Sequence, residues 1–516
     1  MKKGDIYEAV VEQYDFPNKG SLTLEDRKVI IKGALPGQKV RFMITKKKSG
    51  MAEGKILEVL ERAPMEDAEL SCSYFGMCGG CAYRTMSYEN QLTLKESMVK
   101  KLLDKVLLRE GSGSEDYVWE GVLPSPVQEG YRNKMEFTFG DAYKDGPLAL
   151  GLHKKGSFHD ILHVAGCKII GEDWSRILAF TQEFFQEKGV PYFHRMRHEG
   201  ILRNLVIRQS RATGEFLINL VTTTQWEKYG YAGLAMDGIE EAHASNNVGS
   251  TDDTIAVGEN SEAREVLAGI PLLGEYVQGL LALEQEEEFS GKIAGILYTE
   301  NDTLGDVVQS DRTVCLYGTD YIMEEVMGLQ FRISPFSFFQ TNTGGCEVLY
   351  AKAREYIMSG SVMGDARVQQ GKTVFDLYSG TGTIAQMMAP AADKVIGIEI
   401  VEEAVEAAKE NAKLNGLHNC EFIVGDVLKA IDLVEDKPDV IILDPPRDGI
   451  NPKALEKILT FGVDEMVYIS CKPTSLARDL EMITQRGYRV VKACCVDQFP
   501  MTNHVETVVL ITRKGK

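Results

Sequence analysis

The pattern of hydrophobic and polar positions divides the chain into three parts. Residues 1–62 form short alternating runs separated by turn signals such as Pro36-Gly37, without a helical period, which predicts an OB-like β-barrel. From about 120 to 335, strand-like runs with turns between them predict a central, mostly antiparallel β domain. From residue 336 onward, apolar runs alternate with helical patterns, which predicts a doubly wound, Rossmann-like sheet that ends in an antiparallel pair of strands. The predicted fold class is therefore multidomain α/β.

The central part, which we bound at residues 63–335, contains two further features. Apolar residues between 87 and 108 recur at helical spacing, and the helix that they predict is able to pack on the C-terminal domain of residues 336–516. The stretch 237–290 contains thirteen Asp or Glu and one Arg. We interpret it as an acidic insertion, either a loop or helical, whose composition is also compatible with partial disorder.

Composition and charge narrow the class of protein. The chain has 516 residues and no run near the ~18 apolar residues of a membrane span, and its N-terminus does not resemble a signal peptide. We therefore expect a cytoplasmic monomer without a membrane partner. The net charge of −19 argues against nucleic acid, but the first 60 residues carry twelve Lys or Arg against eight Asp or Glu. A basic N-terminal domain is compatible with RNA as a partner, despite the acidic net charge.

A glycine-containing turn marks a candidate cofactor site. The run DLYSGTGT, residues 376–383, follows a hydrophobic strand and opens a helix, and its Gly380 lets the backbone approach a ligand. Glu399 ends the next strand, nineteen residues further on, where a carboxylate can accept the hydroxyls of an adenosine ribose. The run has neither GxGxxG spacing nor a P-loop lysine. Among adenosine cofactors, S-adenosylmethionine fits best.

The run IILDPPRDG, residues 441–449, indicates the kind of atom that is methylated. Asp444 ends a strand, and the two prolines after it hold the backbone extended. In methyltransferases that act on exocyclic amines, an aromatic residue that stacks on the target base normally follows Asp-Pro-Pro. Here that position is Arg447. An amino-group target is therefore disfavoured, and a ring carbon is favoured.

Methylation of C5 in a pyrimidine requires a thiolate that adds to C6 and a base that removes the C5 proton. Cys471 ends the strand after the one bearing Asp444, and Glu506 begins the last strand. Each alone is ambiguous, because a cysteine at a strand end is more often buried packing than a nucleophile. Together, beside a cofactor turn, they favour catalysis. The thiol needs activation, which Lys472 or the backbone can provide; the sequence does not choose between them.

These runs, together with SPFSFFQTN, YISCKPTSLARD and DQFPMTNHVETVVLI, resemble the ordered motifs of the RNA uracil-5-methyltransferase family, which makes 5-methyluridine. The resemblance covers nearly the whole chain and implies an RNA substrate. It implies that Cys471 is the nucleophile and Glu506 the base. It also implies that residues 1–62 are a TRAM module, an RNA-binding β-barrel. The cofactor contacts, taken together, are predicted to come from Gln340, Tyr378, Gly380, Glu399 and Asp444.

The run CSYFGMCGGC holds three of ten cysteines, and a metal site requires a fourth thiol. The spacing alone allows zinc or an iron–sulfur cluster. The larger ribosomal-RNA members of the resembled family carry a [4Fe-4S] cluster on this arrangement, which favours iron. Thiolate addition needs no redox centre, so we expect the cluster to be structural. Its predicted ligands are Cys72, Cys78, Cys81 and Cys167.

The resemblance favours 23S ribosomal RNA as the substrate, with transfer RNA as the alternative. Two rival functions remain: an RNA cytosine-5-methyltransferase, which shares the thiolate chemistry, and an RNA-binding protein without catalysis. The intact Cys471 and Glu506 argue against the second rival. The sequence does not identify the target uridine, the number of target sites or a role for the acidic insertion.

Overall fold

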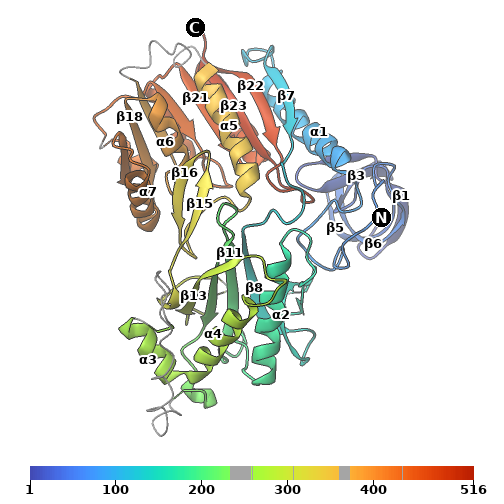
Figure 1. Ribbon diagram of the computed structural model, residues 1–516. Coiled ribbons are helices and arrows are strands. Elements are labelled where there is room, and N and C mark those ends of the chain that lie inside the picture. Colours follow the sequence, from blue (N-terminus) through green and yellow to red (C-terminus); the bar gives the residue numbers. More distant parts are fainter. Residues whose placement is uncertain are drawn as a thin grey trace. The chain divides into compact units, whose positions relative to one another are not determined.

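The computed structural model describes most of the chain: residues 1–157, 159–232, 257–258, 260–305, 307–359, 372–432 and 434–515. The chain forms two compact units (Figure 1). Unit 1 comprises Met1–Ser71, Gly80–Gln128 and Gly344–Lys516, and unit 2 comprises Cys72–Gly79 and Glu129–Thr343. Residues 80–128, which the sequence pattern assigned to the central domain, therefore group with the C-terminal part. Of the acidic insertion, residues 237–256 and 259 lie outside the described residues.

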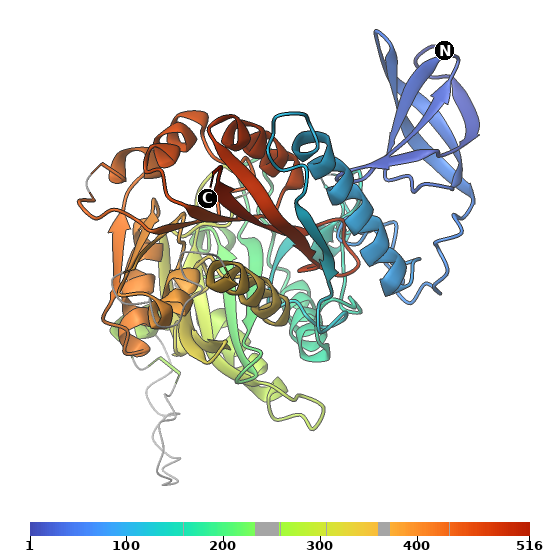
Figure 2. The same ribbon diagram turned by 90° about the horizontal axis from the view of Figure 1, so that it is seen from above.

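Unit 1 begins with a six-stranded sheet in the order β1-β5-β6-β4-β3-β2. Only Val11 and Glu12 join its two edge strands, so the sheet has to curl, which agrees with the predicted N-terminal β module (Figure 2). Val29 and Phe42 are fully buried inside the curl. A side chain at Gly54 would meet the Phe42 ring at 2.8 Å, so β6 passes close to this core. The strands are β1 (Ile6–Val10), β2 (Gln13–Asp15), β3 (Lys19–Leu24), β4 (Arg27–Lys32), β5 (Lys39–Lys48) and β6 (Met51–Glu61).

The C-terminal part of unit 1 is an eight-stranded sheet in the order β19-β18-β17-β20-β21-β23-β22-β7. The first five strands are parallel, and β23 is antiparallel to both β21 and β22, which confirms the predicted doubly wound sheet with an antiparallel end. The edge strand β7 (Val118–Leu123) pairs with β22 and was not predicted there. The other strands are β17 (Thr373–Leu377), β18 (Lys394–Glu399), β19 (Cys420–Val424), β20 (Val440–Leu443), β21 (Glu465–Ser470), β22 (Tyr488–Val496) and β23 (Glu506–Arg513).

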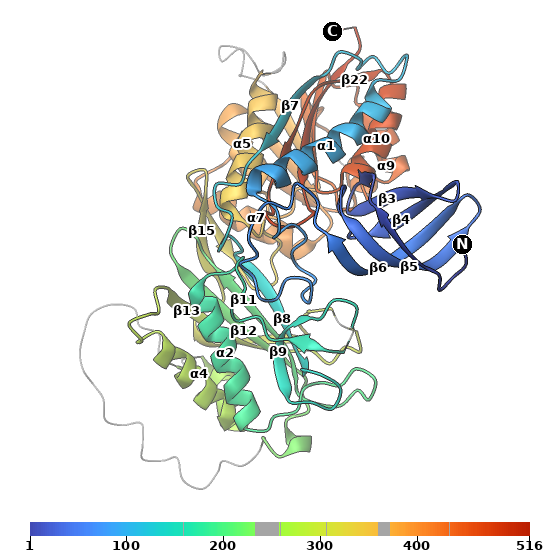
Figure 3. The ribbon, with the colours of Figure 1, turned by 90° about the vertical axis from the view of Figure 1, so that its right-hand side faces the viewer.

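Helices cover both faces of this sheet. The predicted helix over 87–108 is α1 (Tyr88–Leu107), which packs on α10 (Pro473–Gln485), while α5 (Thr343–Ser359) lies on the opposite face (Figure 3). Ser87 caps α1, and Met98 and Leu103 are buried in the core that the sheet shares with α10. The remaining helices are α6 (Thr383–Met388), α7 (Glu402–Leu414), α8 (Val427–Ala430) and α9 (Pro452–Thr460).

Unit 2 is built on a seven-stranded sheet in the order β10-β9-β8-β11-β12-β13-β14. Every neighbouring pair except β12 and β13 is antiparallel, as the sequence predicted for the central domain. A separate hairpin, β15 with β16, follows the sheet. The strands are β8 (Lys134–Asp141), β9 (Leu148–His153), β10 (Ile161–Leu162), β11 (Leu202–Gln209), β12 (Glu215–Thr222), β13 (Lys292–Glu300), β14 (Arg312–Gly318), β15 (Ile322–Val326) and β16 (Leu329–Ile333).

Helices α2 (Glu172–Glu187) and α4 (Pro271–Leu283) pack together in unit 2, where the hydroxyls of Thr181 and Tyr276 lie 2.9 Å apart. The described end of the acidic insertion is therefore helical, comprising α3 (Ser261–Gly269) and α4. Within the described ranges, no single helix is long and apolar enough to cross a membrane. The helices α3 and α4 pass that test only as a pair, and they are bent by 109°.

Candidate active site

Four of the candidate residues follow from the order of the parallel strands in unit 1. The carboxyl ends of parallel neighbours meet at one edge of a sheet, where ligands bind in folds of this type. Each of these residues ends a strand or follows it closely. They are Tyr378 after β17, Glu399 at the end of β18, Asp444 after β20 and Cys471 after β21.

Glu506 reaches the same edge from the opposite direction, because it begins the antiparallel strand β23. In the ladder between β21 and β23, Ser470 pairs with Thr507. Continuing this register by one residue brings Cys471 opposite Glu506. The structure therefore brings the candidate nucleophile and the candidate base together, although they are 35 residues apart in the chain.

The turn after β17 has the backbone geometry of a ligand loop. Tyr378 has φ +70° and Gly380 has φ +54°, so the chain reverses sharply before α6. The Glu399 carboxylate contacts this turn, because Gly380 N–H donates to its Oε2 at 3.0 Å; its Oε1 accepts the N–H of the following residue, Ile400, at 2.8 Å. A side chain at Gly382 would meet the Phe422 ring at 2.6 Å, so this position admits only glycine. Glu399 is thus held beside the turn, as the spacing predicted.

Asp376, the last but one residue of β17, was missed by the sequence reasoning. It is fully buried, and its Oδ2 accepts the Ala385 N–H at 3.0 Å. Its Oδ1, like the buried Ser379 hydroxyl, has no hydrogen-bond partner among the described residues. Burial, followed by the charge of Asp444, raises the pKa of Asp376 to about 8. These two polar atoms beside a glycine turn are therefore available to form hydrogen bonds with a polar cofactor.

The reacting groups share one electrostatic environment. Burial raises the pKa of Asp444 to about 7. Burial and then the Asp444 charge raise the pKa of Glu506 to about 8, and burial, Glu506 and Asp444 raise the pKa of Cys471 to about 11. Arg447 opposes the shift at both Cys471 and Glu506. The thiol is therefore protonated at neutral pH, and Arg447 is a cation that favours its ionisation; Lys472 instead lies 3.6 Å from the Asp448 carboxylate.

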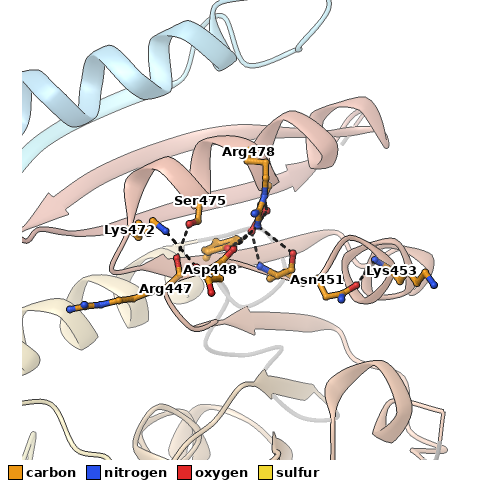
Figure 4. Close-up of polar contacts among 10 residues, drawn as sticks. Arg447, Asp448, Asn451, Lys453, Lys472, Ser475 and Arg478 are labelled. Atoms are coloured by element: carbon orange, nitrogen blue, oxygen red, sulfur yellow. Dashed lines mark hydrogen bonds and ion pairs between the residues drawn. The ribbon is translucent and has the colours of Figure 1, made fainter. Parts of the chain in front are cut away.

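Side chains on α10 hold the backbone of the loop that follows Asp444 (Figure 4). The Ser475 hydroxyl donates to the Arg447 carbonyl at 2.7 Å, and Arg478 Nη2 donates to the Asp448 carbonyl at 2.8 Å. Asp479 accepts the Ile450 N–H at 2.9 Å. Three main-chain groups of one loop are thus tied to one helix. The sequence run LARD carries two of these residues, but the pattern alone did not indicate their role.

Comparisons with known proteins identify the family. The family model described as tRNA (Uracil-5-)-methyltransferase matches residues 311–514. A protein of Clostridium tetani named "uncharacterized RNA methyltransferase" is 45% identical over 514 residues, which covers 100% of this chain and 99% of that protein. The chain belongs to the RNA uracil-5-methyltransferase family. A similarly named protein of Caldanaerobacter subterraneus is 42% identical over 513 residues, with 99% of this methyltransferase and 100% of that protein covered.

The fold of the methyltransferase is also similar to a solved structure. That structure is the tRNA (uracil-54, C5)-methyltransferase of Pyrococcus abyssi in complex with S-adenosyl-L-homocysteine. The TM-score is 0.67, and the match covers 98% of this chain and 100% of that chain. The sequence identity is 22%, so the likeness concerns the fold.

Gln340 belongs to unit 2, whereas the other candidate cofactor residues belong to unit 1. Asn133 Nδ2 donates to the Gln340 carbonyl at 2.9 Å and to the Thr343 hydroxyl at 2.9 Å. These bonds hold the backbone that precedes α5. The assignment of the Gln340 side chain to the cofactor stays a prediction.

Two cysteine-bearing loops of the methyltransferase meet in unit 2. Lys155 N–H donates to the Met77 carbonyl at 2.7 Å, and Gly166 N–H donates to the Tyr74 hydroxyl at 3.2 Å. The loop with Cys72 and Cys78 is thereby tied to the turn that precedes Cys167. Cys81 belongs to unit 1. Across the residues that the structure describes, however, no group of three or more His, Cys, Asp or Glu is arranged to hold a metal ion. The [4Fe-4S] cluster therefore stays a prediction.

Proposed function

We propose that this methyltransferase transfers a methyl group from S-adenosylmethionine to C5 of a uridine in RNA, with Cys471 as nucleophile and Glu506 as base. The observation that carries the proposal is the meeting of a half-buried thiol and a buried carboxyl group at adjacent strand ends. An amine target requires no thiol, whereas C5 of a pyrimidine requires both groups.

The cofactor is proposed to lie at the turn between β17 and α6. Glu399 is suited to accept ribose hydroxyls, and Asp376 and Ser379 have polar atoms left to satisfy. The solved Pyrococcus abyssi structure, which holds S-adenosyl-L-homocysteine, supports this choice of cofactor. When bound, S-adenosylmethionine supplies a sulfonium methyl group that an electron-rich carbon can attack.

The proposed roles of the chain's own residues follow from their protonation. The Cys471 proton has to leave before the sulfur bonds to C6, and this addition makes C5 electron-rich. Asp444, whose pKa is raised to about 7, takes this proton, so that Glu506, whose pKa is raised to about 8, is left for the later step. After methylation, Glu506 in its ionised form takes the C5 proton. The electrons of that C–H bond restore the C5–C6 double bond, and the bond between C6 and sulfur breaks.

The RNA substrate is proposed to be 23S ribosomal RNA, on the strength of the cysteine pattern at Cys72, Cys78 and Cys81. Transfer RNA is the second candidate, because the matching family model and the Pyrococcus abyssi enzyme are both named for it. Residues 1–62 are proposed to bind RNA as a TRAM-like module, supported by the exposed Lys46, Lys47 and Lys48 at the end of β5. Mapping 5-methyluridine in both RNAs from a deletion strain separates the two substrates.

RNA that contains 5-fluorouridine tests the proposed chemistry, because fluorine at C5 cannot be removed as a proton. We expect the wild-type protein to form a covalent RNA adduct that survives denaturing electrophoresis. Cys471→Ala should form none, whereas Cys420→Ala, which removes another half-buried thiol of unit 1, should form it normally. The absence of a wild-type adduct would refute the uracil mechanism, and an adduct with Cys471→Ala would refute the assignment of the nucleophile.

A further inference from the structure

The guanidinium of Arg447 favours ionisation of Cys471, but the steps proposed above give it no contact with the substrate. The side chain is exposed, and it extends away from the contacts that hold its own backbone (Figure 4). Within the part of the chain that the structure describes, the guanidinium makes no hydrogen bond or ion pair. Five N–H donors next to the candidate nucleophile are thus available for a ligand.

The backbone under Arg447 is fixed. Its carbonyl accepts the Ser475 hydroxyl at 2.7 Å, and the next carbonyl, of Asp448, accepts Arg478 Nη2 at 2.8 Å. Gly449 has φ +74°, and a side chain there would meet Arg478 Nη2 at 2.5 Å, so the loop lies directly against α10. A cation on a held backbone loses less entropy on binding than one on a mobile loop.

Among the described residues, no carboxylate forms an ion pair with Arg447. The acidic side chain nearest in sequence, Asp448, is 98% exposed, and its carboxylate forms an ion pair with Lys472 Nζ at 3.6 Å. The first turn of α10, which bears the positive end of the helix dipole, contacts the Arg447 carbonyl through Ser475. Arg447 also acts electrostatically on both Cys471 and Glu506, which places the guanidinium within reach of the reacting groups.

We propose that Arg447 binds a phosphate of the RNA strand at the target nucleotide. This inference rests on the proposed function, because it presumes an RNA substrate. A base that leaves its stack to reach Cys471 brings its own backbone to the mouth of the site. The planar fork of arginine matches two phosphate oxygens at once. Ser475, Arg478 and Asp479 act as positioning residues, since they hold the loop from which Arg447 projects.

The experiment measures equilibrium binding of unmodified 23S ribosomal RNA and transfer RNA transcripts to full-length protein. All variants carry Cys471→Ala, so that binding stays non-covalent. Arg447→Gln removes the charge, and Arg447→Lys keeps the charge without the fork. Arg486→Gln is the matched control, because Arg486 follows the far end of α10 and its Nε pairs with Glu456 at 3.0 Å.

We expect Arg447→Gln to weaken binding of the substrate roughly 10- to 100-fold at low salt. It should also reduce the slope of log affinity against log salt by about 0.7 to 0.9, the amount for one phosphate contact. Arg447→Lys should keep the slope and bind more weakly than the parent, and Arg486→Gln should change neither quantity.

An unchanged salt slope for Arg447→Gln would overturn the proposal. If the slope is unchanged and binding is weaker, Arg447 contacts the nucleobase instead of a phosphate. Methylation by the protein with Cys471 intact separates this result from failure of the proposed function. If that protein makes 5-methyluridine while Arg447→Gln binds RNA like its parent, only the phosphate site is wrong. If it makes none, the proposed function is wrong.

Discussion

Glu506→Gln provides the sharpest test of the proposed base. Glutamine has nearly the same shape as glutamate but cannot accept the C5 proton. Thiolate addition and methyl transfer do not need this group as a base for C5, whereas release of the product does. We therefore expect the variant to accumulate a methylated RNA–protein adduct with one methyl group per chain, and to turn over about 100- to 10,000-fold more slowly than wild type.

The pKa of Glu506 fixes the pH dependence that wild type should show. Burial and the Asp444 charge raise this pKa to about 8, and only the ionised carboxylate can remove a proton. Its ionised fraction rises from roughly 1% at pH 6 to roughly 50% at pH 8, so turnover that is limited by product release should become about 50-fold faster over that range.

The assay measures methyl incorporation against pH and adduct by denaturing electrophoresis. Glu465→Gln is the matched control: Glu465 is also buried and begins β21, at the opposite end of the strand from Cys471. This control should keep turnover and the rising pH limb. A flat wild-type profile between pH 6 and 9, or a Glu506→Gln protein that releases product at the wild-type rate, would refute the role of Glu506.

Two further predictions concern the loop and the cysteines. Gly449→Ala should lower the free energy of unfolding by about 1–3 kcal/mol more than Gly416→Ala. Both glycines have positive φ, but only Gly449 lies against α10. Equal losses of stability in chemical denaturation would contradict the close contact. Protein purified without oxygen should contain about four iron atoms per chain. Cys78→Ala should lose them, whereas Cys315→Ala should retain them; an iron-free wild type would exclude the cluster.

The order of the catalytic strands was predictable, because each strand end is marked in the sequence. Gly380, Pro445 and Pro473 each stop a regular strand, and the alternation of strands and helices fixes parallel neighbours. The meeting of Cys471 and Glu506 followed from one further inference, that the last strands are antiparallel, and the observed register bears it out.

The electrostatics of the site were not predictable in the same way. Lys472 adjoins Cys471 in sequence and was the obvious activating cation, but its ammonium group lies near Asp448. Arg447 acts on the thiol because Ser475 and its neighbours on α10 set the course of the loop, and adjacency in the chain does not report such contacts. Asp376 was missed for a related reason: an aspartate at a strand end is ordinary until its burial is known.

Residues 80–128 group with the catalytic part for a reason that lies far from them in the chain. Lys95 on α1 is fully buried and its ammonium lies 2.6 Å from Asp497, which directly follows the strand residue that pairs with Glu506. The Met501 N–H donates to Gln91 Oε1 at 2.9 Å, so α1 also holds the segment leading to Glu506. Removal of one partner of a buried ion pair lowers the free energy of unfolding by roughly 3–5 kcal/mol. The position of the proposed base therefore depends on a helix encoded about 400 residues earlier, and the local pattern indicated only that this helix was able to pack on the C-terminal domain.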